Sequence, residues 1–193
     1  MVFHPLLLAT YLVLLLNQFF PAMLMIGRPY LWLVTLIIFS FTFVFPALNL
    51  LVLRYWGSIG SLQLESRRER VMPFIFISIM YLLVAFLFYY RLPLSANFNR
   101  LMIIVAALVV TATVITFFYK VSVHSLALWG MVGILFPLVK FSPALLWPTA
   151  IIIALAGLVI SSRLILDAHT PRETLVGSIA GILVGYGGMT VLF

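Results

Sequence analysis

Two short polar segments carry most of the side chains in this chain that could do chemistry. The first contains Lys120 and His124, and the second contains Arg163 and His169, so that each His follows a cation by four to six residues. Cations can hold the peripheral oxygens of a phosphate group. One imidazole can attack phosphorus while the other protonates the leaving oxygen. The two segments therefore indicate chemistry on a phosphate group.

The polar residues around these segments have more than one interpretation. Glu173 lies four residues after His169 and could orient its ring, or it could complete a capping box that begins at Thr170; the two roles are compatible. Ser122 could contact phosphate or cap the helix that follows it. Asp167 could pair with a neighbouring arginine.

The spacing of Arg163 and His169 makes a structural prediction. Residues six apart on a regular helix lie on opposite faces. If both side chains serve one site, the helix that carries Arg163 must end before His169. A third histidine, His4, immediately precedes Pro5 and is predicted to be an interfacial residue at a helix start.

The composition excludes a soluble globular protein. Of the 193 residues, 65% are hydrophobic and only 8% are charged, whereas about a quarter of a soluble domain is charged. The net charge of +7 is spread over several loops, so we predict no nucleic-acid partner. The absence of Cys excludes disulfides and cysteine-nucleophile phosphatase chemistry. No metal-binding motif is present, so no metal and no cofactor is predicted.

Seven apolar runs approach the length of about 20 residues that a spanning helix needs. They cover 5–26, 31–53, 73–90, 100–119, 125–141, 146–162 and 172–193. The first run contains Asn17, Gln18 and Pro21, so it could be kinked or cross incompletely. The prediction is an all-α integral membrane protein, a single domain over 1–193 with six to seven transmembrane helices.

The last apolar run contains a stripe of small residues. Gly177, Gly181 and Gly185 recur every fourth residue and so lie on one face of a helix. Such stripes let helix backbones approach closely in membranes, so we predict tight packing along this face.

The crossings place most ionisable groups on one side of the membrane. That side receives every acid and every His, together with seven of the eleven bases: Glu65, Glu69, Asp167, Glu173, His4, His124, His169, Arg54, Arg67, Arg68, Arg70, Lys120, Arg163 and Arg172. Ionisable residues at the mouth of a membrane bundle suggest a functional site.

The second polar segment resembles a known family signature. Ser162-Arg163, His169 and Glu173 are spaced like the S-R-x5-H-x3-D motif of the type-2 phosphatidic acid phosphatases, and Ser122-Val123-His124 matches the family's P-S-G-H block at Ser and His. This part of the resemblance covers about 100–193. Further similarity, at Phe3-His4-Pro5-Leu6, 65–73 and Ala168-His169-Thr170-Pro171, is to a divergent bacterial branch.

The resemblance implies a metal-independent lipid phosphatase built on about six membrane helices. Arg163 would bind phosphate, His169 would be the nucleophile that becomes phosphorylated, and His124 would be the general acid. Glu173 stands where the family has the Asp that orients the nucleophile. Ser122 would lie beside the phosphate.

The chain also departs from the family pattern. The first family motif, K-x6-R-P, is absent, and Val121 and Val123 replace the Pro and Gly of P-S-G-H. We expect Lys120, with one or two of the nearby Arg67, Arg68 and Arg70, to supply the phosphate-binding cations that the missing motif would have given; Arg67 and Arg70 are the two that we assign to the site.

These observations predict a membrane phosphatase that hydrolyses a lipid phosphate or diphosphate through a phosphohistidine. Its partners would be membrane lipids and the lipid phosphate substrate. The resemblance places it in a bacterial inner membrane with a periplasmic site, whereas the excess of bases would put the same side in the cytoplasm. The alternative is a catalytically decayed bundle that binds lipid headgroups or serves as a subunit of a membrane complex. A transporter or channel is less favoured, because no ionisable residue falls within a predicted hydrocarbon core.

Overall fold

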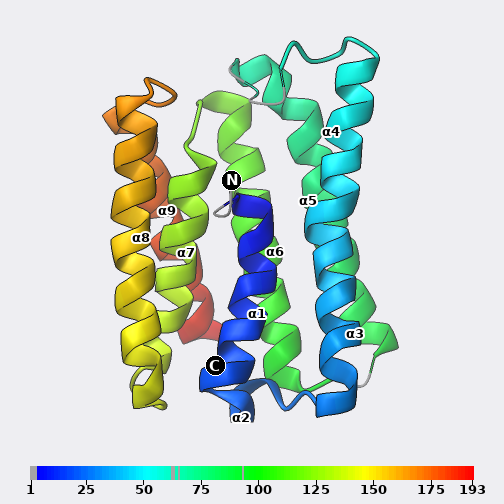
Figure 1. The fold of residues 1–193 in the computed structure, drawn as a ribbon, viewed down its shortest axis with the longest axis vertical. Helices are drawn as coiled ribbons and strands as arrows, with labels where there is room; N and C mark the ends of the chain where they lie inside the picture. Colours follow the sequence, from blue (N-terminus) through cyan, green and yellow to red (C-terminus); the bar gives the residue numbers. More distant parts are fainter. Residues whose placement is uncertain (1–3, 62–63, 65, 93) are drawn as a thin grey trace.

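The chain folds into a bundle of helices that run along one long axis (Figure 1). The computed structural model describes residues 4–61, 64, 66–92 and 94–193, and within these the regular elements are all helical. They are η1 (Pro5–Leu7), α1 (Leu8–Phe19), α2 (Pro21–Leu24), α3 (Arg28–Phe39), the π-helical turn η2 (Ser40–Val44), α4 (Phe45–Tyr55), α5 (Arg67–Arg91), α6 (Ala96–Phe118), α7 (Val123–Leu138), η3 (Pro143–Leu145), α8 (Leu146–Ile165) and α9 (Pro171–Leu192). The predicted fold class is confirmed.

Within the described part of the chain, five helical rods are long and apolar enough to cross a bilayer. They are Arg28–Tyr55, Arg67–Arg91, Ala96–Phe118, Pro143–Ile165 and Pro171–Leu192. Two shorter apolar helices, Pro5–Phe19 and Val123–Leu138, complete the bundle. The chain is therefore a multi-pass membrane protein. The first predicted run is interrupted, because α1 ends at Phe19 and the short α2 begins at Pro21.

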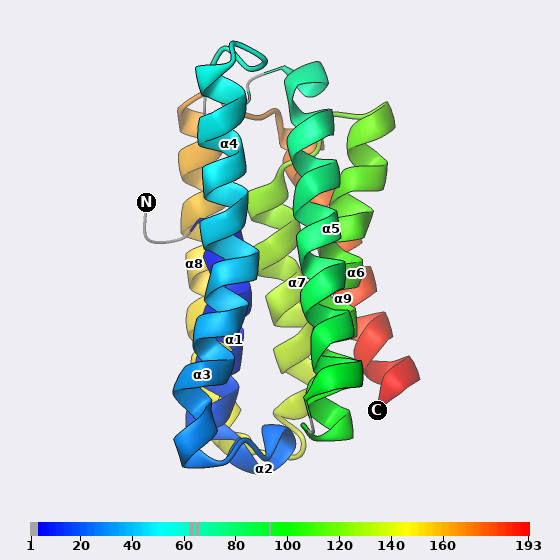
Figure 2. The ribbon, with the colours of Figure 1, turned by 90° about the vertical axis from the view of Figure 1, so that its right-hand side faces the viewer.

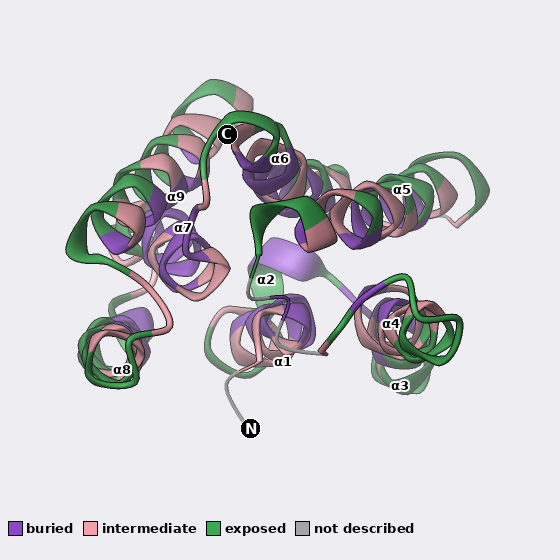
Figure 3. Ribbon diagram, turned by 90° about the horizontal axis from the view of Figure 1, so that it is seen from above, coloured by how far each residue is buried: buried purple, intermediate pink, exposed green. Residues whose placement is uncertain are grey.

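The outer surface of the bundle is apolar. Seen along its axis, exposed residues face outward and buried residues face the other helices (Figure 3). Among the exposed side chains, Trp32 and Trp147 are each 75% accessible and Leu158 is 68% accessible. Phe88 and Phe98 are fully buried between α5 and α6. An apolar exterior of this kind suits a lipid environment.

Hydroxyl side chains cap the N-termini of three helices that reach the site or its surroundings, α5, α6 and α7. Ser66 accepts a hydrogen bond from the backbone of α5, Ser95 from that of α6 and Ser122 from that of α7. Each satisfies a backbone N–H that the first turn of a helix leaves unpaired. The capping role considered for Ser122 is thus confirmed.

The glycine stripe of α9 packs directly on the backbone of α7. A Cβ at Gly177 would lie 2.6 Å from the carbonyl oxygen of Ser122, and one at Gly181 would lie 2.8 Å from the backbone nitrogen of Gly130. Real Cβ atoms do not approach backbone atoms this closely. The predicted close packing is confirmed, and it holds the start of α9 against the start of α7.

Three connections gather at one end of the bundle. The α4–α5, α6–α7 and α8–α9 links lie together at the upper end in Figures 1 and 2, whereas α1 begins well below this end. These links, together with the helix ends that flank them, carry most of the ionisable groups that the crossing count placed on one side. The upper end is therefore where a site for a charged group can form.

Candidate functional site

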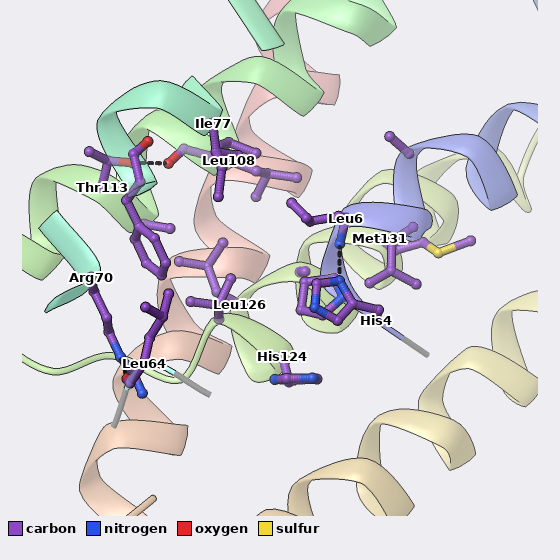
Figure 4. Close-up of a pocket in the computed structure, with 18 of the residues that line it drawn as sticks. His4, Leu6, Leu64, Arg70, Ile77, Leu108, Thr113, His124, Leu126 and Met131 are labelled. Carbon is purple, nitrogen blue, oxygen red and sulfur yellow. Dashed lines mark hydrogen bonds between the residues drawn. The ribbon is translucent and has the colours of Figure 1, made fainter. Parts of the chain in front are cut away.

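A cavity of about 730 Å³ lies inside the bundle below this end. Its wall carries imidazole and cationic groups from the helix ends near the mouth and apolar side chains from further along the helices. Figure 4 shows His4, His124 and Arg70 among the aliphatic side chains of the wall. The polar groups include His4, Arg70, Lys120, His124, Arg163 and His169. The apolar wall includes Leu12 of α1, Ile77 of α5, Leu108 of α6 and Ile134 of α7. The cavity can hold a molecule with one charged and one hydrocarbon part.

His169 is held by a carboxylate at its Nδ1 nitrogen. The distance from Nδ1 to Oε2 of Glu173 is 2.6 Å, and the two side chains are 6% and 12% exposed. A carboxylate only accepts hydrogen bonds, so Nδ1 donates the proton and Nε2 of the neutral ring keeps its lone pair. This tautomer is the one that an imidazole nucleophile requires.

Glu173 performs both of the roles considered for it. Its backbone N–H donates to Oγ1 of Thr170 at 3.3 Å, and its carboxylate accepts from the Thr170 N–H at 3.4 Å. These bonds form a capping box at the start of α9. The box fixes the carboxylate that also holds His169, so the helix start orients the imidazole.

The environment of His169 favours its neutral form. Burial lowers the pKa of the imidazole, because desolvation disfavours the charged ring, and the hydrogen bond to Glu173 acts in the opposite direction. Burial prevails, so the pKa lies below its usual value. A neutral ring is the nucleophilic form.

Arg163 and His124 are in direct contact although they are 39 residues apart. Nη2 of Arg163 lies 2.9 Å from Nε2 of His124. A guanidinium only donates, so Nε2 is the acceptor and the proton of the neutral His124 ring lies on Nδ1. The predicted helix end is confirmed: α8 stops at Ile165, and Asp167 adopts a left-handed φ of 50°. This turn brings Arg163 and His169 to the same cavity.

Lys120 joins the two polar segments. Its Nζ donates to the carbonyl oxygen of Ala168 at 3.3 Å, next to His169. The backbone N–H of Ser122 donates to the carbonyl oxygen of Glu173 at 3.2 Å. The α6–α7 and α8–α9 connections are therefore tied together, as a shared site requires.

The two arginines expected from α5 have different positions. Arg70 is buried, lines the cavity, and donates to the carbonyl oxygens of Leu64 at 2.7 Å and Val121 at 3.0 Å. Arg67 is exposed and donates to the carbonyl oxygen of Phe117. The described wall of the cavity includes Arg70 but not Arg67.

Ser122, the other residue expected beside the phosphate, is also absent from the described wall of the cavity. It is fully buried, and its Oγ accepts a 3.0 Å bond from Oγ of Ser125. It therefore contributes to the site through helix capping. Phe3 and Glu65, which entered the sequence comparison with the phosphatase family, lie outside the described residues.

His4 lies at the cavity, whereas its position before Pro5 predicted only an interfacial residue at a helix start. Its ring centroid lies 6.3 Å from that of His124, and the side chain lines the cavity wall. The available signal was that His4 falls on the same side as the other two histidines.

Comparisons with protein-family models, with curated proteins and with solved structures gave no match. The family resemblance therefore stays a prediction, and the geometry of the cavity carries the functional argument.

Proposed function

We propose that the protein is a metal-independent membrane phosphatase that hydrolyses a lipid phosphate or diphosphate through a phosphohistidine. The observation that carries the proposal is the His169–Glu173 pair. It leaves Nε2 of a neutral imidazole available in a cavity that also contains Arg70, Lys120 and Arg163. A nucleophile surrounded by cations suits attack on a phosphorus atom whose oxygens carry negative charge.

The reaction would proceed in two displacements. In the first, Arg163 leaves Nε2 of His124, and that nitrogen takes up a proton as the substrate binds. Nε2 of His169 then forms a bond to phosphorus while the bond to the leaving oxygen breaks, and that oxygen takes the proton from Nε2 of His124. In the second, water attacks the phosphohistidine, His124 accepts the proton from the water, and inorganic phosphate leaves. Arg163 would exchange its hydrogen bond to His124 for the phosphoryl oxygens. Arg163, Arg70 and Lys120 would together stabilise the negative charge on the phosphoryl oxygens, and this would supply the largest share of the rate enhancement.

The shape of the cavity supports a lipid as the substrate. Below the charged groups the wall is built from buried aliphatic side chains such as Leu12, Leu108 and Ile134. Burying a hydrocarbon chain against such a wall is favourable by roughly 25 cal/mol per Å² of apolar surface. A soluble phosphate ester would leave this part of the cavity unused.

The location follows from the same proposal. The protein would lie in a bacterial inner membrane, with the mouth of the cavity at the periplasmic face. There it would act on lipid phosphates in the outer leaflet as part of lipid metabolism.

The test is phosphate release by the protein purified in detergent, with a chelator present. Phosphatidate, phosphatidylglycerophosphate and undecaprenyl diphosphate would serve as substrates. The wild type should release phosphate and form an acid-labile phosphoprotein, whereas His169→Ala should do neither while still melting cooperatively. Release that survives His169→Ala would exclude His169 as the nucleophile.

The contact between Arg163 and His124 favours one alternative. Nε2 of His124 accepts a hydrogen bond from the permanently charged Arg163. While that bond persists, His124 cannot transfer a proton from Nε2, so the same cluster could bind a phosphate headgroup without hydrolysing it. A headgroup binder, or a phosphatase-like subunit of a membrane complex, would bind orthovanadate but release no phosphate from any lipid. The two functions are thereby separated in one set of measurements.

A further inference from the structure

His4 is the third histidine whose side chain lines the cavity, after His124 and His169. Its ring lies edge-on to that of His124 with 6.3 Å between the centroids, and it also packs against Phe43 at 6.2 Å. Figure 4 shows His4 and His124 next to each other on the wall of the cavity. In the phosphatase mechanism proposed above, His124 carries the proton and His4 has no role.

Hydrogen bonding fixes which nitrogen of His4 can act. The backbone N–H of Leu6 donates to Nδ1 of His4 at 3.3 Å, so the proton of the neutral ring lies on Nε2. The carbonyl oxygen of Leu6 accepts a 3.4 Å bond from Oη of Tyr81 in α5. The turn that carries His4 is thus tied to a second helix of the cavity wall.

The charge state of His4 suits its surroundings. Burial and the nearby Arg163 lower the pKa of the His4 ring, so the ring is neutral near neutral pH. The mouth of the cavity already holds the cations Arg70, Lys120 and Arg163. A neutral imidazole adds a hydrogen-bond donor to the cavity without adding a fourth positive charge.

The spacing of the two rings suits a shared ligand atom. An N–H group donates to oxygen across about 2.9 Å, so nitrogens of two rings whose centroids are 6.3 Å apart can reach a single oxygen between them. In an anion site the oxygen available to such a pair belongs to the phosphate group.

We propose that His4 contacts the substrate directly, its Nε2–H donating to the phosphate oxygen that His124 also contacts. This inference rests on the proposed phosphatase function and deepens it by one residue. His4 makes and breaks no covalent bond and keeps its proton throughout. It is a hydrogen-bond donor to the charge that develops on the oxygen.

Two substitutions separate this role from the capping of η1. Asn at position 4 keeps an acceptor near the place of Nδ1, and Asn is a good helix cap, but it has no donor near the place of Nε2. Gln carries an amide nitrogen at about the reach of Nε2. Because hydrogen bonds to charged groups are the stronger kind, His4→Asn should lower kcat/KM for lipid phosphate release by about 10- to 100-fold. The melting temperature should not change, and His4→Gln should recover much of the loss.

The experiment measures phosphate release and orthovanadate affinity for the wild type, His4→Asn and His4→Gln. Wild-type values in His4→Asn would overturn the role of His4 and leave the proposed function standing. Equal losses in both variants with lower melting temperatures would assign His4 to capping alone and overturn the proposal. If the wild type binds vanadate but releases no phosphate, weaker vanadate binding by His4→Asn than by His4→Gln supports the contact, and equal binding overturns it. A wild type that does neither overturns both proposals.

Discussion

The contact between α7 and α9 can be tested with Gly181→Ala. A Cβ on Gly181 would lie 2.8 Å from the backbone nitrogen of Gly130 and closer still to the carbonyl oxygen of Leu126. Ordinary van der Waals contact begins at 3.4 Å. Both neighbours are backbone atoms and no side chain can rotate away, so the two helices must separate by at least about 0.6 Å.

Such overpacking costs roughly 1–3 kcal/mol in well-packed interiors. For a chain of this length each kcal/mol shifts the melting temperature by about 2–4 °C. We therefore expect Gly181→Ala to melt about 2–12 °C below the wild type. The measurement is thermal unfolding in dodecyl maltoside, followed by circular dichroism.

The matched control lies on the same helix. Gly187 has nothing within 4 Å of its Cβ position, and Ala is a better helix residue than Gly by roughly 0.5–1 kcal/mol. Gly187→Ala should therefore melt at or slightly above the wild-type temperature. If Gly181→Ala and Gly187→Ala melted at the same temperature, the backbone contact between α7 and α9 would be refuted.

Three further predictions concern the cavity. Glu173→Gln should lower phosphate release by about 100-fold or more, because the Gln amide can donate to Nδ1 as well as accept from it and no longer fixes the His169 tautomer that leaves the lone pair on Nε2. Since Glu173 raises the pKa of His169, the acid limb of the pH–rate profile should also move to lower pH; an unmoved limb would count against His169 as the titrating nucleophile. Arg163→Ala should lower release by about 10²- to 10³-fold, whereas Arg67→Ala, on the exposed surface, should change it less than about threefold; equal losses would contradict the positions described for the two residues. Val109→Phe narrows the apolar part of the cavity and should raise KM for a long-chain phosphatidate but not for a short-chain one. Equal effects on both lipids would show that the chain binds elsewhere.

The cluster at the mouth of the cavity is built from three parts of the chain that are far apart in the sequence. The α6–α7 link supplies Lys120 and the start of α9 supplies Glu173, and these two elements are held together by the glycine stripe. Arg70 reaches the same place from α5 through its bonds to backbone carbonyls. Its guanidinium therefore has a structural role as well as the proposed role in phosphate binding.

The sequence by itself determined the features that depend on neighbours along the chain. Its scarcity of charge required a bilayer, and its apolar runs gave the spanning helices. The four-residue spacing of His169 and Glu173, and of Gly177 and Gly181, places each pair on one helix face. The S-R-x5-H spacing required a helix end that the structure contains. These features could be predicted because helix geometry relates residues a few positions apart.

Only the tertiary structure decided which side chains from different helices meet. The rotation of α5 puts Arg70 in the cavity and Arg67 on the surface, although both belong to one turn of helix. The short α1 begins below the ends of its neighbours (Figure 1) and so places His4 beside His124, 120 positions away in the chain. Helix rotation and axial offset follow from the packing of the whole bundle, and no local pattern in the sequence encodes them.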